Sequence, residues 1–309
     1  MGTVVNRFLG RQKKKLRPRS YAETERFLNR LWKPLHGLGL GKITQAIVAN
    51  RLSLIATNHG ATAADRARAA LSTLFTWAMK EGLAPTNPVA ATNKHAEGKS
   101  RDRTLSDAEL AAIWKVLPND QYGAIVKLLV LTGQRRDEIG ALRWSEVNVD
   151  KALISLPGER TKNHRPHDVP MSNLAKSILE AQPKRDDREL IFGTRQGSFQ
   201  GWSKAKRELD EAVAEAAAGA KSAAMKPWRL HDLRRTVATR MSDLGVQPHV
   251  VEAVLNHVSG YKAGVAGIYN RSAYTAEKRA ALILWADHVS TQSQARSFDD
   301  DSLCSRRLR

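Results

Sequence analysis

Two segments of the chain place a pair of adjacent arginines among apolar residues. The first is LTGQRRDEIGALRW at 131–144, and the second is LHDLRRTVATR at 230–240. A surface helix accommodates such a pair freely, but a buried guanidinium needs an anionic partner. The first question is therefore which arginine of each pair points inward, and what anion it would meet.

Helical spacing separates the two arginines of the first pair. In a helix over 134–143, Arg135 shares a face with the apolar Ile139, whereas Arg136 falls on a polar stripe. Arg135 would then point inward from the first turn, where free backbone N–H groups and the helix dipole favour an anion. Glu138, three residues later, is placed to hold the Arg135 guanidinium.

The same argument applied to a helix over 230–244 selects Arg234, which lies beside His231 next to the core stripe. Arg235 falls with Asp232 on the face expected to meet solvent. An inward arginine taken singly most often bridges a buried carboxylate, so each segment alone leaves both interpretations open. Two convergent guanidiniums with an imidazole favour the other interpretation, a site for a phosphate and for charge developing on it.

A lysine on a predicted β-hairpin is a further candidate. Residues 151–156 and 165–170 have the pattern of two strands, and the basic loop between them carries Lys162. A mobile ammonium at this position could reach a neighbouring groove. The alternative is a lysine that is simply solvated.

The segment VLNHVSGYKAGVAGIYNR at 254–271 offers His257 at a helix end and Tyr269 as a nucleophile for covalent phosphoryl transfer. A tyrosine has an ordinary pKa near 10, so adjacent cations would help Tyr269 to ionise. A half-buried core tyrosine is the alternative, and Tyr261 and Tyr274 compete for the same role.

Several other kinds of phosphate chemistry lack their signatures. The sequence has no close group of carboxylates for two Mg²⁺ ions, no glycine-rich loop with Lys-Ser/Thr and no Cys/His zinc spacing. We therefore expect no metal and no cofactor, with arginines supplying the electrostatic stabilisation.

The charge of the chain favours a nucleic-acid partner. Fifty Lys and Arg against 31 Asp and Glu give +19 and a pI near 10.3. Residues 1–103 hold 19 of these basic residues and only 6 acidic ones. A merely basic protein is the alternative, and a membrane-surface protein fits less well because no single amphipathic anchor carries the charge. With one cysteine, Cys304, no signal-peptide pattern and no long apolar run, we expect an intracellular protein in a reducing compartment such as the cytoplasm.

Helical periodicity predicts an N-terminal helical domain over 1–90. The periodicity extends through 20–86 and is clearest at 65–82, a predicted helix that ends at Gly82. Its apolar positions recur at helical spacing: Leu71, Leu74, Phe75, Ala78 and Met79. The periodicity is lost in 91–103, a basic linker.

The second domain is expected over 104–289 and is mainly α with a small β-sheet. It opens with a capping box formed by Ser106 and Glu109, and 189–193 is a candidate third strand. The polar tail, 290–309, is predicted to be disordered.

At these motifs the chain resembles the tyrosine recombinases of the phage-integrase family, especially the integrases of prophages and genomic islands. TGQRRDEI resembles the first-arginine box, TKNHRPHDVP the lysine hairpin and HDLRRT the His-x-x-Arg box. LNHVSG and GIYNR resemble the second-histidine and tyrosine boxes, although LNH replaces the commoner Leu-Gly-His. The order agrees across 104–288, and 71–89 looks like part of the family's core-binding domain.

The resemblance implies a role for each candidate residue. Arg135 and Arg234 would clamp the scissile phosphate, with Glu138 supporting Arg135. Tyr269 would attack to give a 3′-phosphotyrosyl link and a free 5′-hydroxyl. The remaining residues would move protons or donate hydrogen bonds: Lys162 as the acid for the leaving oxygen, His231 in proton transfer and His257 as a donor to the phosphate.

The family also implies an architecture. The helical core-binding domain and the mixed α/β catalytic domain would close as a C-shaped clamp around duplex DNA, and a homotetramer would form on synapsed sites. Accessory DNA-bending or directionality proteins are expected partners. We predict DNA contacts by basic residues of the 65–82 helix and the linker: Arg66, Arg68, Lys94, Lys99, Arg101 and Arg103.

Two features of the chain bear on assembly. The helix expected over 276–288 is amphipathic. It would either pack on its own catalytic domain or, as the family pattern implies, dock on a neighbouring protomer. The chain begins at or near the core-binding domain, so the arm-binding module that many such integrases carry is expected to be absent or removed.

Site-specific integration or excision of a mobile element is therefore the leading hypothesis. A nicking-closing enzyme of the type IB topoisomerase kind would use the same chemistry without sequence specificity. A DNA-binding regulator that retains the fold without cleaving is the third interpretation, and the full set of motifs makes it the weakest.

Overall fold

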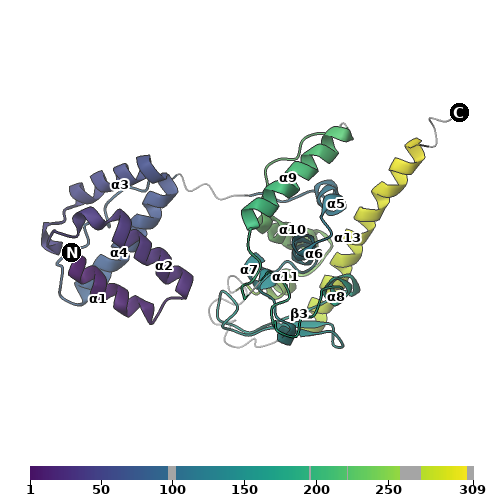
Figure 1. Cartoon of the computed structure of the whole chain (residues 1–309), viewed down its shortest axis with the longest axis horizontal. Helices are drawn as coiled ribbons and strands as arrows, with labels where there is room; N and C mark the ends of the chain where they lie inside the picture. The colour runs from purple at the N-terminus through teal and green to yellow at the C-terminus, as the bar shows by residue number, and fades with distance from the viewer. Residues whose placement is uncertain (97–101, 195, 221, 258–272, 305–309) are drawn as a thin grey trace. The chain divides into compact units, whose positions relative to one another are not determined.

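The computed structural model describes residues 1–96, 102–194, 196–220, 222–257 and 273–304, with the backbone alone for 293–304. The chain divides into two compact units, Met1–Arg101 and Asp102–Arg309. Each unit has its own hydrophobic core. The division falls inside the segment predicted to be a linker, and Figure 1 shows both units by residue colour.

Among its described residues, the first unit contains helices and turns but no strand. Its α-helices are α1 (Gly2–Lys13), α2 (Pro18–Arg26), α3 (Gln45–His59) and α4 (Ala61–Lys80), with short turns at η1 (Phe27–Leu31), η2 (Lys33–Leu35) and η3 (Leu40–Lys42). Pro18 starts α2, and the Thr44 hydroxyl caps α3 by accepting from the backbone of Ile47. Helix α1 was not predicted by periodicity, because Lys and Arg dominate its exposed face.

Helix α4 forms the centre of this unit. It was predicted from residue 65 but begins at Ala61, immediately after Gly60, whose φ of +87° joins it to α3. Leu71, Leu74 and Phe75 are buried as predicted. Met79 is not, since it lies on the exposed side of the helix while Trp77 packs inward.

The second unit consists of helices around a small sheet. The helices are α5 (Asp107–Val116), α6 (Gln121–Thr132), α7 (Arg136–Gly140), α8 (Asn173–Glu180), α9 (Trp202–Gly219), α10 (Leu230–Asp243), α11 (Pro248–Val254) and α13 (Thr275–Cys304), with the short turn η4 (Trp144–Glu146). The predicted capping box of α5 is present, because Ser106 and Glu109 each accept from the other's backbone N–H.

Three antiparallel strands form the sheet in the order β1 (Val147–Asn148), β2 (Leu153–Leu156) and β3 (His167–Pro170). Leu156 pairs with His167 at the loop end of the β2–β3 hairpin, so the predicted hairpin and its basic loop are present. The predicted strand at 189–193 is not a full strand: Leu190 makes an isolated bridge with Arg143, and Gly193 then turns the chain at φ +101°.

Helix α6 is the buried centre of the second unit, with α8, α10 and α13 against it (Figure 1). Nearly every residue of α6 is buried, and it ends at Gly133 in the left-handed conformation. The site described below begins at this helix end. Within the described ranges, no helix is long and apolar enough to cross a membrane.

The C-terminal tail was predicted to be disordered from residue 290, and this was wrong for 290–304. Helix α13 runs from Thr275 to Cys304 (yellow in Figure 1). Polar composition alone suggested disorder, but 290–304 contains no Gly or Pro to end the helix.

Helix α13 packs on the second unit, to which it belongs. Trp285 is fully buried and donates from its indole nitrogen to the carbonyl of Val130 at 2.7 Å, and Leu282 and Val289 are buried beside it. Within this chain the helix therefore takes the first of the two predicted arrangements.

Candidate active site

Arg135 lies at the junction between α6 and α7. Its guanidinium donates to the Glu138 carboxylate at 2.8 Å, and its backbone N–H donates to the same carboxylate at 3.1 Å. Glu138 is buried, so the predicted ion pair is well shielded from water. Because Glu138 fixes both ends of Arg135, it positions the guanidinium before any ligand arrives.

The two arginines of the first pair diverge as predicted, although the helix boundary was wrong. Helix α7 begins at Arg136 rather than 134, and Arg135 is its N-cap residue, with extended backbone. Arg136 pairs with Asp137 and lies over the ring of Trp202, with its carbon Cζ 4.9 Å from the ring centre. The sharp turn at Gly133 leaves α7 too short to include residues before Arg136.

Arg234, on α10, is 4% exposed and is held by the ends of two helices. One guanidinium nitrogen donates to the carbonyl of Gly133 at 2.7 Å, and another donates to the carbonyl of Leu255, which follows α11. Carbonyls at helix C-termini carry partial negative charge and favour a cation. Among the described residues, no carboxylate pairs with this buried arginine.

The second pair also diverges. Arg235 is more exposed and pairs with the Asp232 carboxylate at 2.8 Å. Asp232 was predicted to face solvent, and this was wrong: it is fully buried and accepts from the backbone N–H of Arg229 at the start of α10. A capping carboxylate folds back over the helix end, which side-chain phase alone does not describe.

The two inward arginines meet at one turn. Arg234 donates to the carbonyl of Leu255, and Arg135 donates to that of the next residue, Asn256, at 3.4 Å. Burial, followed by the charge of Arg135, lowers the pKa of Arg234 to about 9, so Arg234 remains charged at neutral pH. The structure therefore brings together two guanidiniums from segments about a hundred residues apart.

Two histidines lie within reach of this positive charge. Burial, then the charges of Arg234 and Arg135, lowers the pKa of His257 to about 4. The pKa of His231 is also lowered, by partial desolvation and then by the charges of Arg234 and Arg235, although the side chain as a whole is exposed. Both imidazoles are therefore neutral at pH 7 and can accept a proton or donate an N–H.

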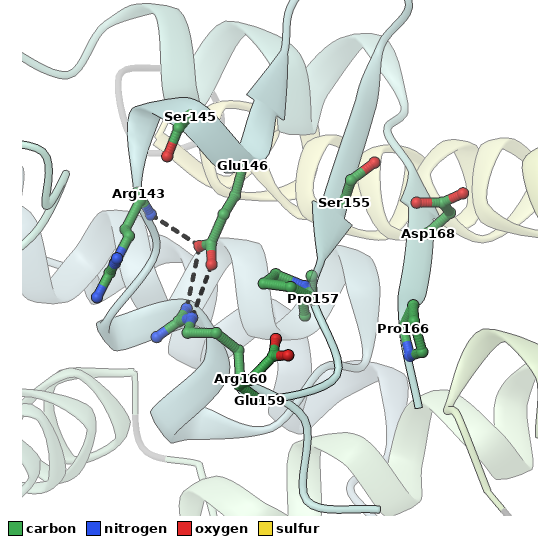
Figure 2. A pocket seen from close by; sticks show the side chains of 10 residues that line it. Arg143, Ser145, Glu146, Ser155, Pro157, Glu159, Arg160, Pro166 and Asp168 are labelled. Carbon is green, nitrogen blue, oxygen red and sulfur yellow. Dashed lines mark hydrogen bonds and ion pairs between the residues drawn. The ribbon is translucent and has the colours of Figure 1, made fainter. Parts of the chain in front are cut away.

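The hairpin loop between β2 and β3 carries Lys162 at an exposed position, where it makes no hydrogen bond or ion pair with any described residue. The base of the loop is anchored by Arg160, which pairs with the buried carboxylate of Glu146 at 2.7 Å and donates to the carbonyl of Glu138 at 2.9 Å. Figure 2 shows this pair beside an open pocket of about 700 Å³ on the sheet. The pocket adjoins the loop but includes neither inward arginine.

Two buried polar residues beneath the site were missed by sequence reasoning. His167 and Gln134 both donate to the carbonyl of Val254, at 3.0 and 2.9 Å. Burial, then the charge of Lys278, lowers the pKa of His167 to about 3, so it is neutral. Gln134 adjoins the first-arginine motif and His167 belongs to the lysine hairpin, but spacing alone gave neither a partner.

The predicted nucleophile, Tyr269, lies outside the described residues, as does its competitor Tyr261. The other competitor, Tyr274, adjoins the start of α13, and its ring lies 5.1 Å from that of His249 on α11. The described part of the site therefore holds the predicted phosphate-binding and proton-transfer groups. Among the described residues, no group of three or more His, Cys, Asp or Glu could hold a metal ion.

The profile of the phage integrase family matches residues 103–275, which include the whole of this site. The chain belongs to the phage integrase family. Prophage integrase IntZ of Escherichia coli K12 is 30% identical to it over 236 residues, covering 74% of this chain and 56% of IntZ. Prophage integrase IntA of the same strain is 33% identical over 161 residues, covering 52% of this chain and 37% of IntA. The chain thus spans little more than half of IntZ, and less of IntA.

The fold is also that of phage integrases. A lambda integrase (75–356) dimer, solved bound to a core site, superposes with a TM-score of 0.63 at 21% identity, covering 83% of this chain and 94% of that one. A Tn1549 transposon integrase, solved with transposon right-end DNA, gives 0.66 at 13% identity, covering 90% and 96%. At these identities the likeness concerns the fold, a mainly helical chain with a small sheet.

Two of the residues predicted to contact DNA have structural partners within the chain. Arg68 donates to the carbonyls of Val89, Ala90 and Thr92 and so fixes the segment after α4 to the first unit. This segment includes the start of the predicted linker, which is therefore packed at least to Thr92. Carbonyls outside a helix or strand need donors, and Arg68 supplies them together with Thr92, whose hydroxyl donates to the carbonyl of Val89 at 2.7 Å.

Arg103 likewise pairs with Glu109 at 2.5 Å and donates to the carbonyl of Thr104, so its guanidinium stabilises the start of α5. Arg66 is exposed and pairs with Glu23 at 2.9 Å, an interaction that DNA could displace. Lys94 is exposed, and Lys99 and Arg101 lie outside the described residues.

Proposed function

We propose that this chain is a site-specific DNA recombinase of the tyrosine type, which integrates or excises a mobile element in the bacterial cytoplasm. The observation that supports this most strongly is the convergence of Arg135 and Arg234 on one turn, with two neutral histidines beside them, in a member of the phage integrase family. Arg135 pairs with Glu138, and Arg234 has no carboxylate partner among the described residues, so the two guanidiniums keep a net positive charge that suits a phosphodiester.

In the first step the Tyr269 oxygen attacks the scissile phosphorus. An O–P bond to tyrosine forms, the bond from phosphorus to the 5′-oxygen breaks, and the phenol proton passes to His231, which is neutral at pH 7. Lys162 gives a proton to the departing 5′-oxygen. Arg135, Arg234 and His257 stabilise the charge on the phosphoryl oxygens, and no metal is required.

In the second step the 5′-hydroxyl of a partner duplex attacks the 3′-phosphotyrosyl link. Its proton returns to Lys162, the tyrosine leaves and recovers a proton from His231, and the strand is rejoined. The phosphotyrosyl bond retains the free energy of the phosphodiester, so no ATP is consumed.

Strand exchange requires protein on both duplexes, so we propose a homotetramer on two synapsed sites, assisted by DNA-bending or directionality proteins. The two units would close as a C-shaped clamp on double-stranded DNA, with the basic segment between them crossing it. Lambda integrase, which is similar in fold, has been solved both as a dimer on a core site and as a tetramer on a Holliday junction, and this supports the proposed assembly.

The experiment that tests the proposed function begins by identifying the DNA site that the protein cleaves. Sequencing of DNA covalently trapped by this protein in cells should return a defined site, which is then built into a suicide duplex whose cleaved strand cannot be rejoined. The wild-type chain should form a denaturant-resistant adduct on this duplex. Tyr269→Phe should abolish the adduct while DNA binding is retained.

Other outcomes of this experiment would each support a different interpretation of the protein. An adduct that persists in Tyr269→Phe and maps to Tyr261 or Tyr274 would move the nucleophile but keep the reaction. Relaxation of any supercoiled plasmid without a preferred site would indicate a nicking-closing enzyme. Tight binding with no adduct on any site would indicate a DNA-binding protein without this activity.

A further inference from the structure

The turn that follows α11 connects the inward arginines to the hairpin loop. Asn256 adopts a left-handed backbone, with φ +49°, so the carbonyls before and after its Cα point to different neighbours. The carbonyl of Leu255 accepts from Arg234, whereas that of Asn256 accepts from Arg135 at 3.4 Å and from Asn163 at 3.0 Å. The turn therefore reaches the hairpin loop as well as both arginines.

Two asparagine side chains complete this connection. The Asn163 amide nitrogen donates to the Asn256 side-chain oxygen at 2.9 Å, and the Asn256 amide nitrogen donates back to the Asn163 oxygen at 3.3 Å. The Asn163 oxygen also accepts from the backbone N–H of Arg165 at 3.2 Å, which folds the loop around its own tip. The pair spans 93 residues of sequence and is partly shielded from water.

Each of the two asparagines is adjacent in sequence to a candidate site residue. Asn163 directly follows Lys162, and Asn256 directly precedes His257. Lys162 has no described partner of its own, so its place depends on the backbone that Asn163 fixes. The Arg160–Glu146 ion pair holds the base of the loop, and the buried Thr161 donates to the carbonyl of Arg165 at 2.7 Å within it, whereas the asparagine pair joins the tip to the turn after α11.

We propose that Asn163 and Asn256 are positioning residues, which hold the tip of the hairpin loop against the turn and thereby set the distance from Lys162 to the scissile phosphate. This rests on the proposed function for the role of Lys162, but the attachment of the loop does not. A glycine at 256 would adopt the same backbone without an amide, so Asn256 supplies both the turn conformation and the link.

The attachment is tested without DNA, by amide hydrogen exchange on the full chain. Asn256→Gly preserves the left-handed turn and removes only the side-chain link, whereas Asn163→Ala removes the other partner. Both should speed exchange in 157–166 by about 3- to 10-fold, the range expected for one or two hydrogen bonds, with α5 unchanged as the internal control. Exchange in 157–166 equal to wild type in both variants would overturn the proposal.

The consequence for Lys162 is tested on the suicide duplex identified above. If the pair positions a proton donor, Asn163→Ala and Asn256→Gly should slow cleavage about tenfold, and the double variant no more than either single one. A duplex with a bridging sulfur in place of the 5′-oxygen has a leaving group that needs no proton. Cleavage of that duplex should return close to the wild-type rate in these variants, as in Lys162→Ala.

The outcomes separate the two proposals. Equal slowing on the oxygen and sulfur duplexes would show that the pair does not act through proton donation, and would overturn the positioning role. Absence of any wild-type adduct would refute the proposed function, while hydrogen exchange would still decide whether the pair holds the loop. Wild-type cleavage rates in both single variants would likewise refute the positioning role.

Discussion

Arg135 and Arg136 are adjacent in sequence but have different partners: a buried carboxylate for Arg135, and a partly buried ring and an exposed carboxylate for Arg136. We expect Arg135→Ala to reduce the rate of strand cleavage by about 10²- to 10³-fold, because it removes a donor to the charge that develops on the phosphate. Arg136→Ala is the matched control and should change the rate less than about threefold. Adduct formation on a suicide duplex measures both.

Loss of Arg135 also leaves Glu138 buried without its partner, which could lower the stability of the fold. Arg135→Lys retains the positive charge and removes the planar pair of donors. It should therefore remain as stable as wild type in urea, yet cleave at least tenfold more slowly. Cleavage at the wild-type rate in Arg135→Lys would contradict a bidentate role for this residue.

The protonation of His167, which lies beneath the site, makes the free energy of unfolding depend on pH. Its pKa is about 3 in the folded chain and about 6.5 when unfolded. Between these values the unfolded chain binds more protons, so the free energy of unfolding falls as the pH falls. We expect a loss of up to about 2 kcal/mol from this residue between pH 6.5 and 5.

His167→Gln keeps a nitrogen donor for the carbonyl of Val254 but cannot titrate. Urea unfolding at pH 7, 6 and 5 should therefore show a shallower pH dependence than in wild type. His257 contributes in the same direction, since its pKa is also lowered, so some dependence should remain. An unchanged slope in His167→Gln would show that His167 is not the titrating group.

The orientation of the site arginines could be predicted from sequence because it depends on helical phase, a local property. The hydrogen-bond partners could not. Arg234 meets Gly133 and Leu255, and Asn163 meets Asn256, across separations that periodicity does not encode. The prediction that Asp232 faces solvent was wrong for a related reason, because a capping side chain bends back toward the backbone at the start of its helix.

At the scale of elements, α13 gives the clearest contrast between buried and exposed apolar residues. Trp285 is fully buried against α6, whereas Ile283 and Leu284 on the same helix are exposed. We expect Trp285→Ala to lower the free energy of unfolding by about 3–5 kcal/mol. Leu284→Ala should change it by less than about 1 kcal/mol.

Urea denaturation of the full chain measures these two variants. Comparable stability losses in both would contradict the packing of α13 on its own unit. If Leu284→Ala were stable but impaired in assembly on DNA, we would infer that the exposed side of the helix contacts another protomer. Helix α13 would then pack on its own unit with one side and dock on a neighbouring protomer with the other.

Helices with strong apolar periodicity, such as α4 and α10, were predictable to within a few residues. Helix α1 and the end of α13 were not, because their charged and polar sequences depend on neighbours or on the absence of a stop signal. The short α7 was overextended because the left-handed Gly133 displaces its start.

At the scale of the whole molecule, the two units differ in what they contribute. Residues 1–101 have their own core of buried aromatic and aliphatic residues, while basic residues greatly outnumber acidic ones in them. We expect a fragment of residues 1–101 to unfold cooperatively by itself. It should bind duplex DNA of any sequence with an affinity that falls steeply as salt rises.

Circular dichroism melting and binding titrations at several salt concentrations measure this behaviour. A fragment of residues 102–309 is the natural comparison, because it retains the two inward arginines but carries less of the excess charge. A fragment 1–101 that stays unfolded would show that its core depends on the second unit. Salt-independent binding would exclude phosphate contacts as its source of affinity.

The Asn163–Asn256 pair also predicts how these two positions vary among related sequences. An amide at 163 has its side-chain partner only when position 256 carries one, and a glycine at 256 satisfies the backbone alone. Across an alignment of relatives, the two columns should therefore vary together: asparagine at 256 should be accompanied by a hydrogen-bonding residue at 163, and glycine at 256 by freer choice there. Two positions 93 residues apart would then have evolved as one unit.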